Sequence, residues 1–418
     1  MIFTGSLPNL IQFIACLKSG YFVKSSRLMS VNSATAFHAN EPEHFRYVDG
    51  LRGIAVLLVL FVHTAYYMDP ATVFHQIGVF GQYGVQLFFV MSAFTLCHSM
   101  NRHERLSGQE YRKFFSRRFF RIAPLYYLGL VGYGCYTMLS FRLFGKTPWT
   151  NPSDYTAGGI LSNFLFLHDL FPPGKPIVPG GWSIGCEFLF YAMFPPLFFV
   201  VKRSNWSLLL LLLLGLAVTL VIPSLYERLG WHETPENNSF HYAFISNQIP
   251  CFALGMLYFF RRQSTWFRGL IYGLLLPSLA GLLIWHDHHI GWMFTPYCSG
   301  IVSVALALFL EKARTPLWLS RIGVLSFSIY MVHFIVVWNV CVLFLRKFPA
   351  SITHSWSATL LYLGILAVTL CIAHATHRWI EQPCILFGKR WISSRFGNRK
   401  VCHGIAGSPD TAGANERL

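Results

Sequence analysis

Long apolar runs separated by short polar segments occupy most of this 418-residue chain. A helix needs about 20 apolar residues to cross the roughly 30 Å hydrocarbon core of a bilayer. The runs predict ten membrane-spanning helices. They lie near residues 51–67, 79–99, 122–140, 183–201, 207–223, 243–260, 269–285, 292–310, 322–345 and 357–380. The stretch GGILSNFLFLHDL, from Gly158, is too short to cross and predicts a re-entrant or interfacial segment.

The polar remainder is too short for a separate soluble domain. The pattern therefore predicts one all-α, polytopic membrane domain over residues 46–385, with about ten transmembrane helices around a central cavity. Residues 1–45 are interpreted as a cytoplasmic N-terminal tail. Residues 386–418 are interpreted as a basic, partly disordered cytoplasmic C-terminal tail.

Composition supports this class, since 54% of the residues are hydrophobic and only 12% are charged. The net charge is +16, and the ten-span topology places 27 of the 33 Lys and Arg residues on the side of the two termini. This asymmetry predicts a multi-pass protein of the cytoplasmic (inner) membrane with both termini in the cytoplasm. Membrane topology accounts for the positive charge, so the expected partners include the lipid bilayer and no nucleic acid.

The metal-ligand residues do not form a convincing site. The ten cysteines contain no CxxC pair and lie mostly in apolar runs, where a thiol behaves as a small hydrophobe. The tract HDHH at 286–289 resembles a metal-binding sequence but falls in a predicted outer loop. We therefore expect no metal site.

The first span, LRGIAVLLVLFVH, contains two ionisable residues. Arg52 and His63 are eleven residues apart, which is about three helical turns, so they share one face about 16 Å apart along the axis. An ionisable side chain within a bilayer is costly unless it faces protein or water, so both residues are candidates for lining one cavity. The alternative is that Arg52 only anchors the helix at the interface and His63 is a hydrogen-bonded core residue.

The segment before the third span, RHERLSGQEYRKFFSRRFFR, is strongly basic. Arg118 and Arg121 lie at i, i+3 and therefore on one helix face. Two guanidinium groups at this spacing can bind a phosphate or diphosphate through paired hydrogen bonds. A basic loop that contacts anionic lipid headgroups would show the same composition.

Two later helices carry polar side chains at helical spacing. In GGWSIGCEFLFYAMFPP, Ser183 and Glu187 lie at i, i+4, and a carboxylate within an apolar run indicates either a functional group or a structural pair between helices. In LSFSIYMVH, Ser326, Tyr330 and His333 form one polar stripe. Such a stripe predicts a lined cavity, because each group would otherwise face lipid.

These motifs together resemble the membrane-bound acyltransferase family 3. The resemblance covers roughly residues 45–385 and rests on six segments that are specific as an ordered set. In order they are YVDGLRGIAVLLVLFVH, GVQLFFVMSAFTL, RRFFRIAPLYYL, GGWSIGCEFLFYAMFP, PCFALGMLYFF and LSFSIYMVH. Phe327 replaces a frequent Tyr and Ala93 a common Gly of the family, departures that concern local packing.

The resemblance implies an O-acyltransferase that moves an acyl group, by default acetyl, from cytoplasmic acyl-coenzyme A. The acceptor would be a hydroxyl of a carbohydrate or lipid-linked carbohydrate, such as a cell-surface polysaccharide or lipopolysaccharide. Acyl-coenzyme A is then a substrate, and no tightly bound cofactor is expected. The sequence does not define the acceptor or the oligomeric state.

The family's motifs also imply roles for individual residues. The catalytic candidates are His63, Glu187 and Ser183. The donor-binding candidates are Arg52, Arg118 and Arg121. The polar stripe described above adds Ser326, Tyr330 and His333 as cavity-lining candidates.

In the resulting hypothesis neutral His63 takes the proton of the acceptor hydroxyl, and Glu187 orients the imidazolium or positions the acceptor. Transfer is direct, or it passes through an acyl-enzyme on Ser183 or His63. One internal cavity is expected to join the guanidinium groups to the imidazole.

Two other classes of protein compete with this hypothesis. Intramembrane His, Glu and Arg also mark translocation pathways, so the chain could be a proton-coupled or anion transporter. Transporters often contain two related halves with broken helices, and the sequence shows no such repetition. A catalytically inert scaffold would leave the aligned polar groups on three helices unexplained.

Overall fold

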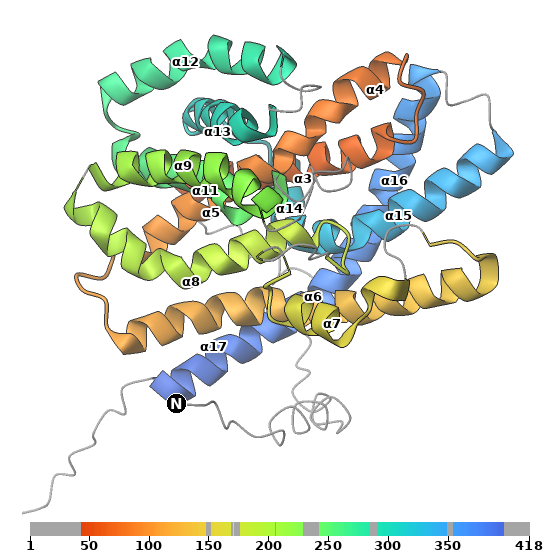
Figure 1. Cartoon of the computed structure of the whole chain (residues 1–418), viewed down its shortest axis with the longest axis horizontal. Helices are drawn as coiled ribbons and strands as arrows, with labels where there is room; N and C mark the ends of the chain where they lie inside the picture. Colours follow the sequence, from red (N-terminus) through yellow and green to blue (C-terminus); the bar gives the residue numbers. More distant parts are fainter. Residues whose placement is uncertain are drawn as a thin grey trace, which may run out of the picture. The chain divides into compact units, whose positions relative to one another are not determined.

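The computed structural model of the chain describes residues 43–147, 152–168, 170, 176–204, 206–228, 242–284, 291–348 and 354–396. All regular structure in these ranges is helical, which confirms the all-α class predicted from the hydrophobic pattern (Figure 1). The packing described below concerns the unit formed by residues 47–418.

Each predicted span corresponds to a helix of the structure. These helices are α3 (Glu43–Ala65), α5 (Gly84–Met100), α6 (Gly108–Phe144), α8 (Gly181–Arg203), α9 (Trp206–Arg228), α11 (Ile245–Arg261), α12 (Thr265–Ile284), α13 (Gly291–Leu310), α15 (Ser326–Lys347) and α16 (Ser355–Thr376). Seven helical segments among the described residues are long and apolar enough to cross a membrane. The chain is therefore a polytopic membrane protein.

Shorter elements connect these helices. They are α4 (Val73–Gly78), η1 (Val79–Tyr83), η2 (Pro152–Asp154), α7 (Ala157–Phe164) and α14 (Leu317–Val324). The π-helical segment η4 (His377–Glu381) joins α16 to the last described helix, α17 (Gln382–Phe396). The segment from Gly158 expected to be re-entrant or interfacial contains α7, whose eight residues are too few to cross a bilayer.

Helix α6 begins and ends at residues suited to those positions. The Ser107 hydroxyl accepts a hydrogen bond from the Glu110 amide at 3.1 Å, and a Ser followed three residues later by Glu is typical of a helix start. At the other end Gly145 adopts a left-handed conformation with φ of 65°. One unbroken helix of 37 residues therefore carries Arg118 and Arg121 about three turns from its start.

Two predicted segments differ from the structure. The span expected at 322–345 is broken at Leu325, where α14 ends and α15 begins. Residues 386–396, assigned from sequence to the C-terminal tail, belong to helix α17, which continues from α16 through η4. Helix α17 packs on α6 so closely that a Cβ added at Gly388 would lie 2.5 Å from the Cβ of Phe120.

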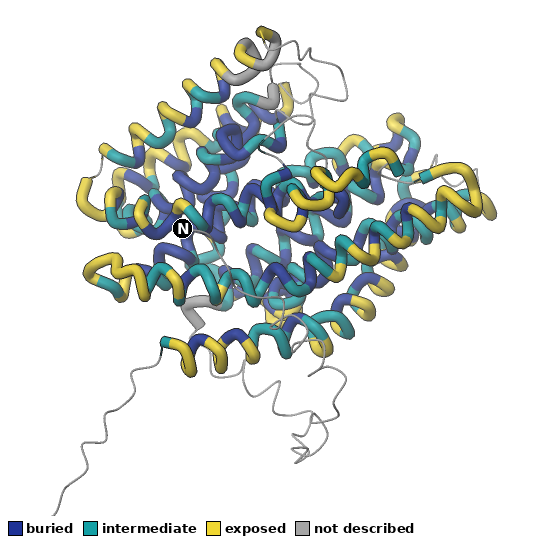
Figure 2. The backbone as a smooth tube through the Cα atoms, turned by 60° about the horizontal axis from the view of Figure 1, so that its bottom comes forward, coloured by how far each residue is buried: buried dark blue, intermediate teal, exposed yellow. Residues whose placement is uncertain are grey.

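Residues at contacts between helices are buried, and residues on the outward-facing sides of the helices are exposed. Most of α3 and α5 is buried, whereas α12 is largely exposed. Figure 2 shows buried positions where helices lie side by side and exposed positions on their outward sides. The exposed positions include Leu210, Leu276, Leu283 and Leu360. Leucines in such numbers on the outside of a soluble protein would favour aggregation, but in a membrane protein they face lipid.

Candidate active site

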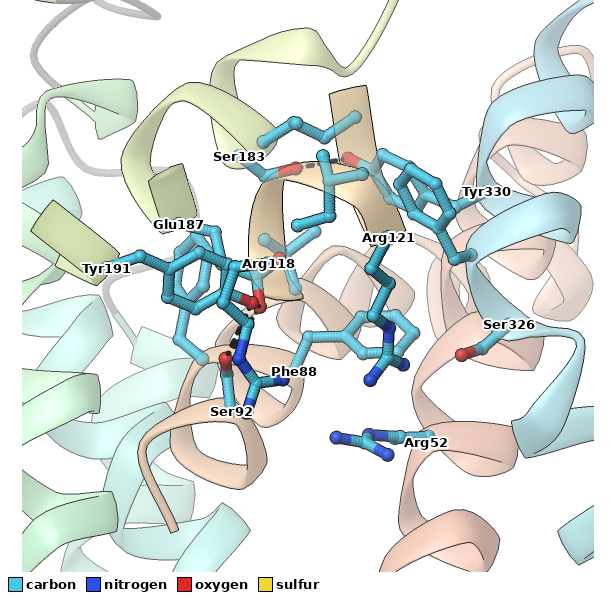
Figure 3. A pocket seen from close by; sticks show the side chains of 15 residues that line it. Arg52, Phe88, Ser92, Arg118, Arg121, Ser183, Glu187, Tyr191, Ser326 and Tyr330 are labelled. Atoms are coloured by element: carbon cyan, nitrogen blue, oxygen red, sulfur yellow. Dashed lines mark hydrogen bonds between the residues drawn. The ribbon is translucent and has the colours of Figure 1, made fainter. Parts of the chain in front are cut away.

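Five helices contribute side chains to one pocket (Figure 3). The space between its lining side chains, counted together with the solvent to which the pocket opens, is about 680 Å³. The helices α3, α5, α6, α8 and α15 supply its lining, which comprises Arg52, Val85, Phe88, Phe89, Ser92, Arg118, Arg121, Ile122, Ser183, Ile184, Glu187, Tyr191, Ser326, Phe327 and Tyr330. All three arginines predicted to bind the donor are among these residues.

The three guanidinium groups converge on one side of the pocket (Figure 3). Arg52 is held by Asp49 at 3.4 Å on its own helix and by the Thr95 hydroxyl of α5 at 3.3 Å. The guanidinium of Arg118 lies over the rings of Phe114 and Tyr191, at 5.7 Å from each centroid. Such stacking orients a guanidinium while leaving its edge N–H groups available to an anion.

Glu187 supplies the carboxyl group of the pocket lining, and two hydroxyl groups hold it in place. Its Oε1 accepts a hydrogen bond from the Ser92 hydroxyl of α5 at 2.6 Å and another from the Tyr191 hydroxyl. Tyr191 is four residues from Glu187, so helical spacing could have identified it. Ser92 could not be found this way, because its approach depends on how α5 packs against α8.

Ser183 and Tyr330 join α8 to α15 at the other end of the pocket (Figure 3). Their hydroxyl oxygens are 2.7 Å apart. Both hydroxyls also contact the carbonyl oxygen of Gly180, at 3.0 Å from Ser183 and 2.9 Å from Tyr330. The structure therefore brings together Ser183 and Tyr330, from two separate sequence motifs, and Ser326 lines the same pocket.

His63 and His333 lie outside the lining of this pocket. The ring of His63 is 5.1 Å from that of His333 and 4.3 Å from that of Phe334, measured between centroids. The ring of His333 is in turn 5.4 Å from that of Tyr330. The structure therefore does not show the expected single cavity joining the guanidinium groups to His63. Instead, the pocket residue Tyr330 is linked to His63 by ring contacts through His333 of α15.

The hydrogen bond of His63 defines its tautomer. Its Nδ1 lies 2.7 Å from the carbonyl oxygen of Val59. Because a carbonyl oxygen only accepts, Nδ1 carries the proton, and in the neutral ring Nε2 holds the lone pair. His63 is therefore arranged to accept a proton at Nε2. The ring of His63 contacts His333 and Phe334 of α15 and also Tyr66. The carboxylate of Glu187 is bonded instead to Ser92 and Tyr191.

Among the described residues, no group of three His, Cys, Asp or Glu side chains could hold a metal ion. The HDHH tract lies outside the described residues.

Comparison with known proteins identifies the class of this chain. The family model described as "Acyltransferase domain" matches residues 45–378. The chain therefore belongs to acyltransferase family 3 and is an acyltransferase.

Two curated relatives are similar over different lengths. The protein "Acyltransferase MdmB" of Streptomyces mycarofaciens is 26% identical over 374 residues, which covers 82% of this chain and 92% of the relative. "Protein 2 in picA locus" of Rhizobium radiobacter is 33% identical over 110 residues, covering 26% of this chain and 53% of the relative. No solved structure matches the chain.

Proposed function

We propose that this acyltransferase moves an acetyl group from cytoplasmic acetyl-coenzyme A to a hydroxyl of a carbohydrate acceptor, such as a cell-surface polysaccharide or lipopolysaccharide. The observation that carries the proposal is the convergence of Arg52, Arg118 and Arg121 on one pocket. The lining contains three arginines and a single carboxyl side chain, that of Glu187, a composition suited to binding a polyanion. Coenzyme A is such a molecule, because it carries phosphates at one end and the thioester at the other.

Arg52, Arg118 and Arg121 would bind the donor's phosphates through charge-assisted hydrogen bonds. Glu187 would then balance part of this positive charge and, through Tyr191, fix the surface on which Arg118 stacks. This role replaces an orienting contact with His63, because the Glu187 carboxylate is bonded to Ser92 and Tyr191.

His63 would act as the general base of the reaction. Its Nε2 would accept the proton from the acceptor hydroxyl as that oxygen attacks the thioester carbonyl. The Val59 carbonyl would hold Nδ1–H, so that the ring presents the same nitrogen throughout the reaction. His333 and Phe334 would fix the plane of the His63 ring.

The membrane orientation is part of the proposal. The family resemblance supports a cytoplasmic donor, and the charge asymmetry of 27 against 6 basic residues supports the same side for both termini. We place the protein in the cytoplasmic membrane as a multi-pass enzyme with the three arginines at its cytoplasmic side. The carbohydrate hydroxyl would then reach His63 from the opposite side.

The test uses membranes that contain the protein, labelled acetyl-coenzyme A, and lipid-linked or polymeric sugar acceptors. The parent should form an alkali-labile O-acetyl product, and the His63→Ala variant should form none above background. His75→Ala is the matched control, because the Nδ1 of His75 also bonds a backbone carbonyl, that of Ala65 at 2.8 Å. This control should acylate at the parent rate.

The outcomes separate the competing classes of function. Normal acylation by His63→Ala would show that His63 is not the base. Accumulation of a solute in sealed vesicles, with no acylated product from the parent, would instead favour the transporter.

A further inference from the structure

The hydroxyls of Ser183 and Tyr330 form a hydrogen-bonded pair whose hydrogens can change their acceptor. Three oxygen–oxygen contacts of 2.7, 3.0 and 2.9 Å join Ser183, Tyr330 and the Gly180 carbonyl. Only two hydroxyl hydrogens serve these three contacts. Since hydroxyls rotate at little cost, both hydrogens can turn from the Gly180 carbonyl to a more negative oxygen that enters the pocket.

Gly180 has the conformation that this arrangement needs. Its φ is +73°, which favours glycine, and an added Cβ would lie 2.9 Å from the Tyr330 hydroxyl oxygen and 3.0 Å from Cε2 of Phe334. Gly180 also caps α8, in which Ser183 is the third residue. The partial positive charge at the start of this long helix adds to the attraction of an anionic oxygen at the hydroxyl pair.

The hydroxyl pair lies between the two groups that the proposed function uses. It lines the same pocket as the three arginines and lies at the opposite end of it (Figure 3). Phe334, which approaches Gly180, also has its ring 4.3 Å from that of His63. A thioester with its phosphates on the arginines would thus extend toward the hydroxyls, with the imidazole one ring beyond.

We propose that Ser183 and Tyr330 together form the oxyanion-binding site of this acyltransferase, with Ser183 acting as a hydrogen-bond donor instead of a nucleophile. Transfer of an acyl group through a tetrahedral intermediate places negative charge on the carbonyl oxygen, and preorganised donors at that oxygen stabilise the transition state. Tyr330 is then a catalytic residue. The assignment rests on the proposed function for its thioester donor and its base.

The step balances in atoms and electrons. The acceptor oxygen forms a bond to the acyl carbon, its proton passes to Nε2 of His63, and the carbonyl π electrons move to the oxygen held by Ser183 and Tyr330. When the carbonyl re-forms, the carbon–sulfur bond breaks and the thiolate takes the proton from His63. No acyl-enzyme is formed.

Steady-state kinetics with Tyr330→Phe and Ser183→Ala tests this assignment. Loss of one oxyanion donor typically lowers kcat by about 100-fold or more, and the KM for the donor should change little. Because both hydroxyls act on one oxygen, the double variant should lose less than the product of the two single losses. The variants should be compared as solubilised, monodisperse protein, so that poor folding is separated from slow chemistry.

Tyr133→Phe is the matched control. The buried hydroxyl of Tyr133 donates to the carbonyl of Met331, the residue after Tyr330, at 2.9 Å, yet Tyr133 does not line the pocket. Its removal should leave kcat near the parent value. Equal losses in Tyr133→Phe and Tyr330→Phe would reduce the Tyr330 effect to packing and overturn the assignment.

A second readout follows the acyl group itself. Labelled acetyl-coenzyme A supplied without acceptor should leave no acyl group on Ser183 in peptide analysis. Recovery of acyl-Ser183, or a Tyr330→Phe variant whose loss lies in KM alone, would overturn the assignment. Different results would contradict the two proposals. A parent protein without activity toward acetyl-coenzyme A would contradict the proposed donor. A Tyr330→Phe variant as active as the parent would contradict only the role of the hydroxyl pair.

Discussion

Arg118 and Arg117 are neighbours in sequence with different environments. Arg118 lines the pocket and stacks on Phe114 and Tyr191, whereas Arg117 is exposed and does not line the pocket. Hydrogen bonds to a charged group contribute about 1.5–3 kcal/mol, which corresponds to a loss of roughly 10-fold to 150-fold in donor affinity when the guanidinium is removed. Arg118→Ala should therefore raise the KM for acetyl-coenzyme A by at least about 10-fold.

The same measurement on Arg117→Ala provides the control for Arg118→Ala. It removes equal charge from the adjacent position, and its KM should match that of the parent. The ranking of sugar acceptors should be the same in all three proteins. An unchanged KM in Arg118→Ala, or equal effects of the two substitutions, would remove Arg118 from the donor site.

Side chains that share one helix were the part of the site that sequence could predict. Spacing of three or four residues places Arg118 with Arg121 and Ser183 with Glu187 on one face, and the structure finds all four in one pocket. The contact of Ser92 with Glu187 was not predictable, because it depends on the approach of two helices.

His63 shows the limit of such reasoning. Sequence spacing places His63 on the same helix face as Arg52. The surroundings of its side chain, however, depend on the rings of His333 and Phe334 of α15, which pack against it.

At the scale of elements, α3 and α14 meet through glycines. A Cβ added at Gly53 would lie 2.4 Å from the carbonyl oxygen of Leu319, and one added at Gly323 would lie 1.7 Å from that of Asp49. Small residues allow membrane helices to bring their backbones into contact. Asp49 also pairs with Arg52, so this contact fixes the helix that carries a pocket arginine.

Gly323→Ala should therefore destabilise the protein. Its methyl group cannot fit beside the Asp49 carbonyl, and overpacking of this kind typically costs about 1–3 kcal/mol. Gly364→Ala is the control, because the structure leaves open space around that position of α16. Thermal unfolding in detergent should show a lower Tm for Gly323→Ala only. Equal Tm values for Gly323→Ala and the parent would contradict the tight contact.

The sequence predicted the helices well, because the length of an apolar run can be read from the sequence without knowledge of tertiary contacts. The break at Leu325 was not predicted, although it separates α14 from the part of α15 that begins with Ser326. No proline occurs at this position, and the preceding Gly323 lies against the backbone of α3. The break is thus associated with a tertiary contact that hydropathy does not report.

For the whole molecule, sequence predicted an all-α polytopic protein, and the structure confirms this class. The arrangement of five helices around the arginine pocket could not be derived from hydropathy. Apolar length specifies that a helix crosses the membrane, but helix neighbours are specified by packing of small side chains and polar contacts. Helices far apart in sequence, such as α3 and α15, therefore meet at positions that only a three-dimensional structure shows.

The orientation of the whole molecule gives a last prediction, which tests the charge asymmetry directly. Arg105 lies in the exposed turn between α5 and α6, on the predicted cytoplasmic side, and Ser153 is exposed in η2 on the predicted outer side. In intact cells a membrane-impermeant thiol reagent should label Ser153→Cys and leave Arg105→Cys unmodified. Both should react after the cells are opened. Peptide mass analysis separates these sites from the ten natural cysteines. Labelling of Arg105→Cys in intact cells, with Ser153→Cys protected, would reverse the orientation and place the arginine pocket on the side away from cytoplasmic coenzyme A.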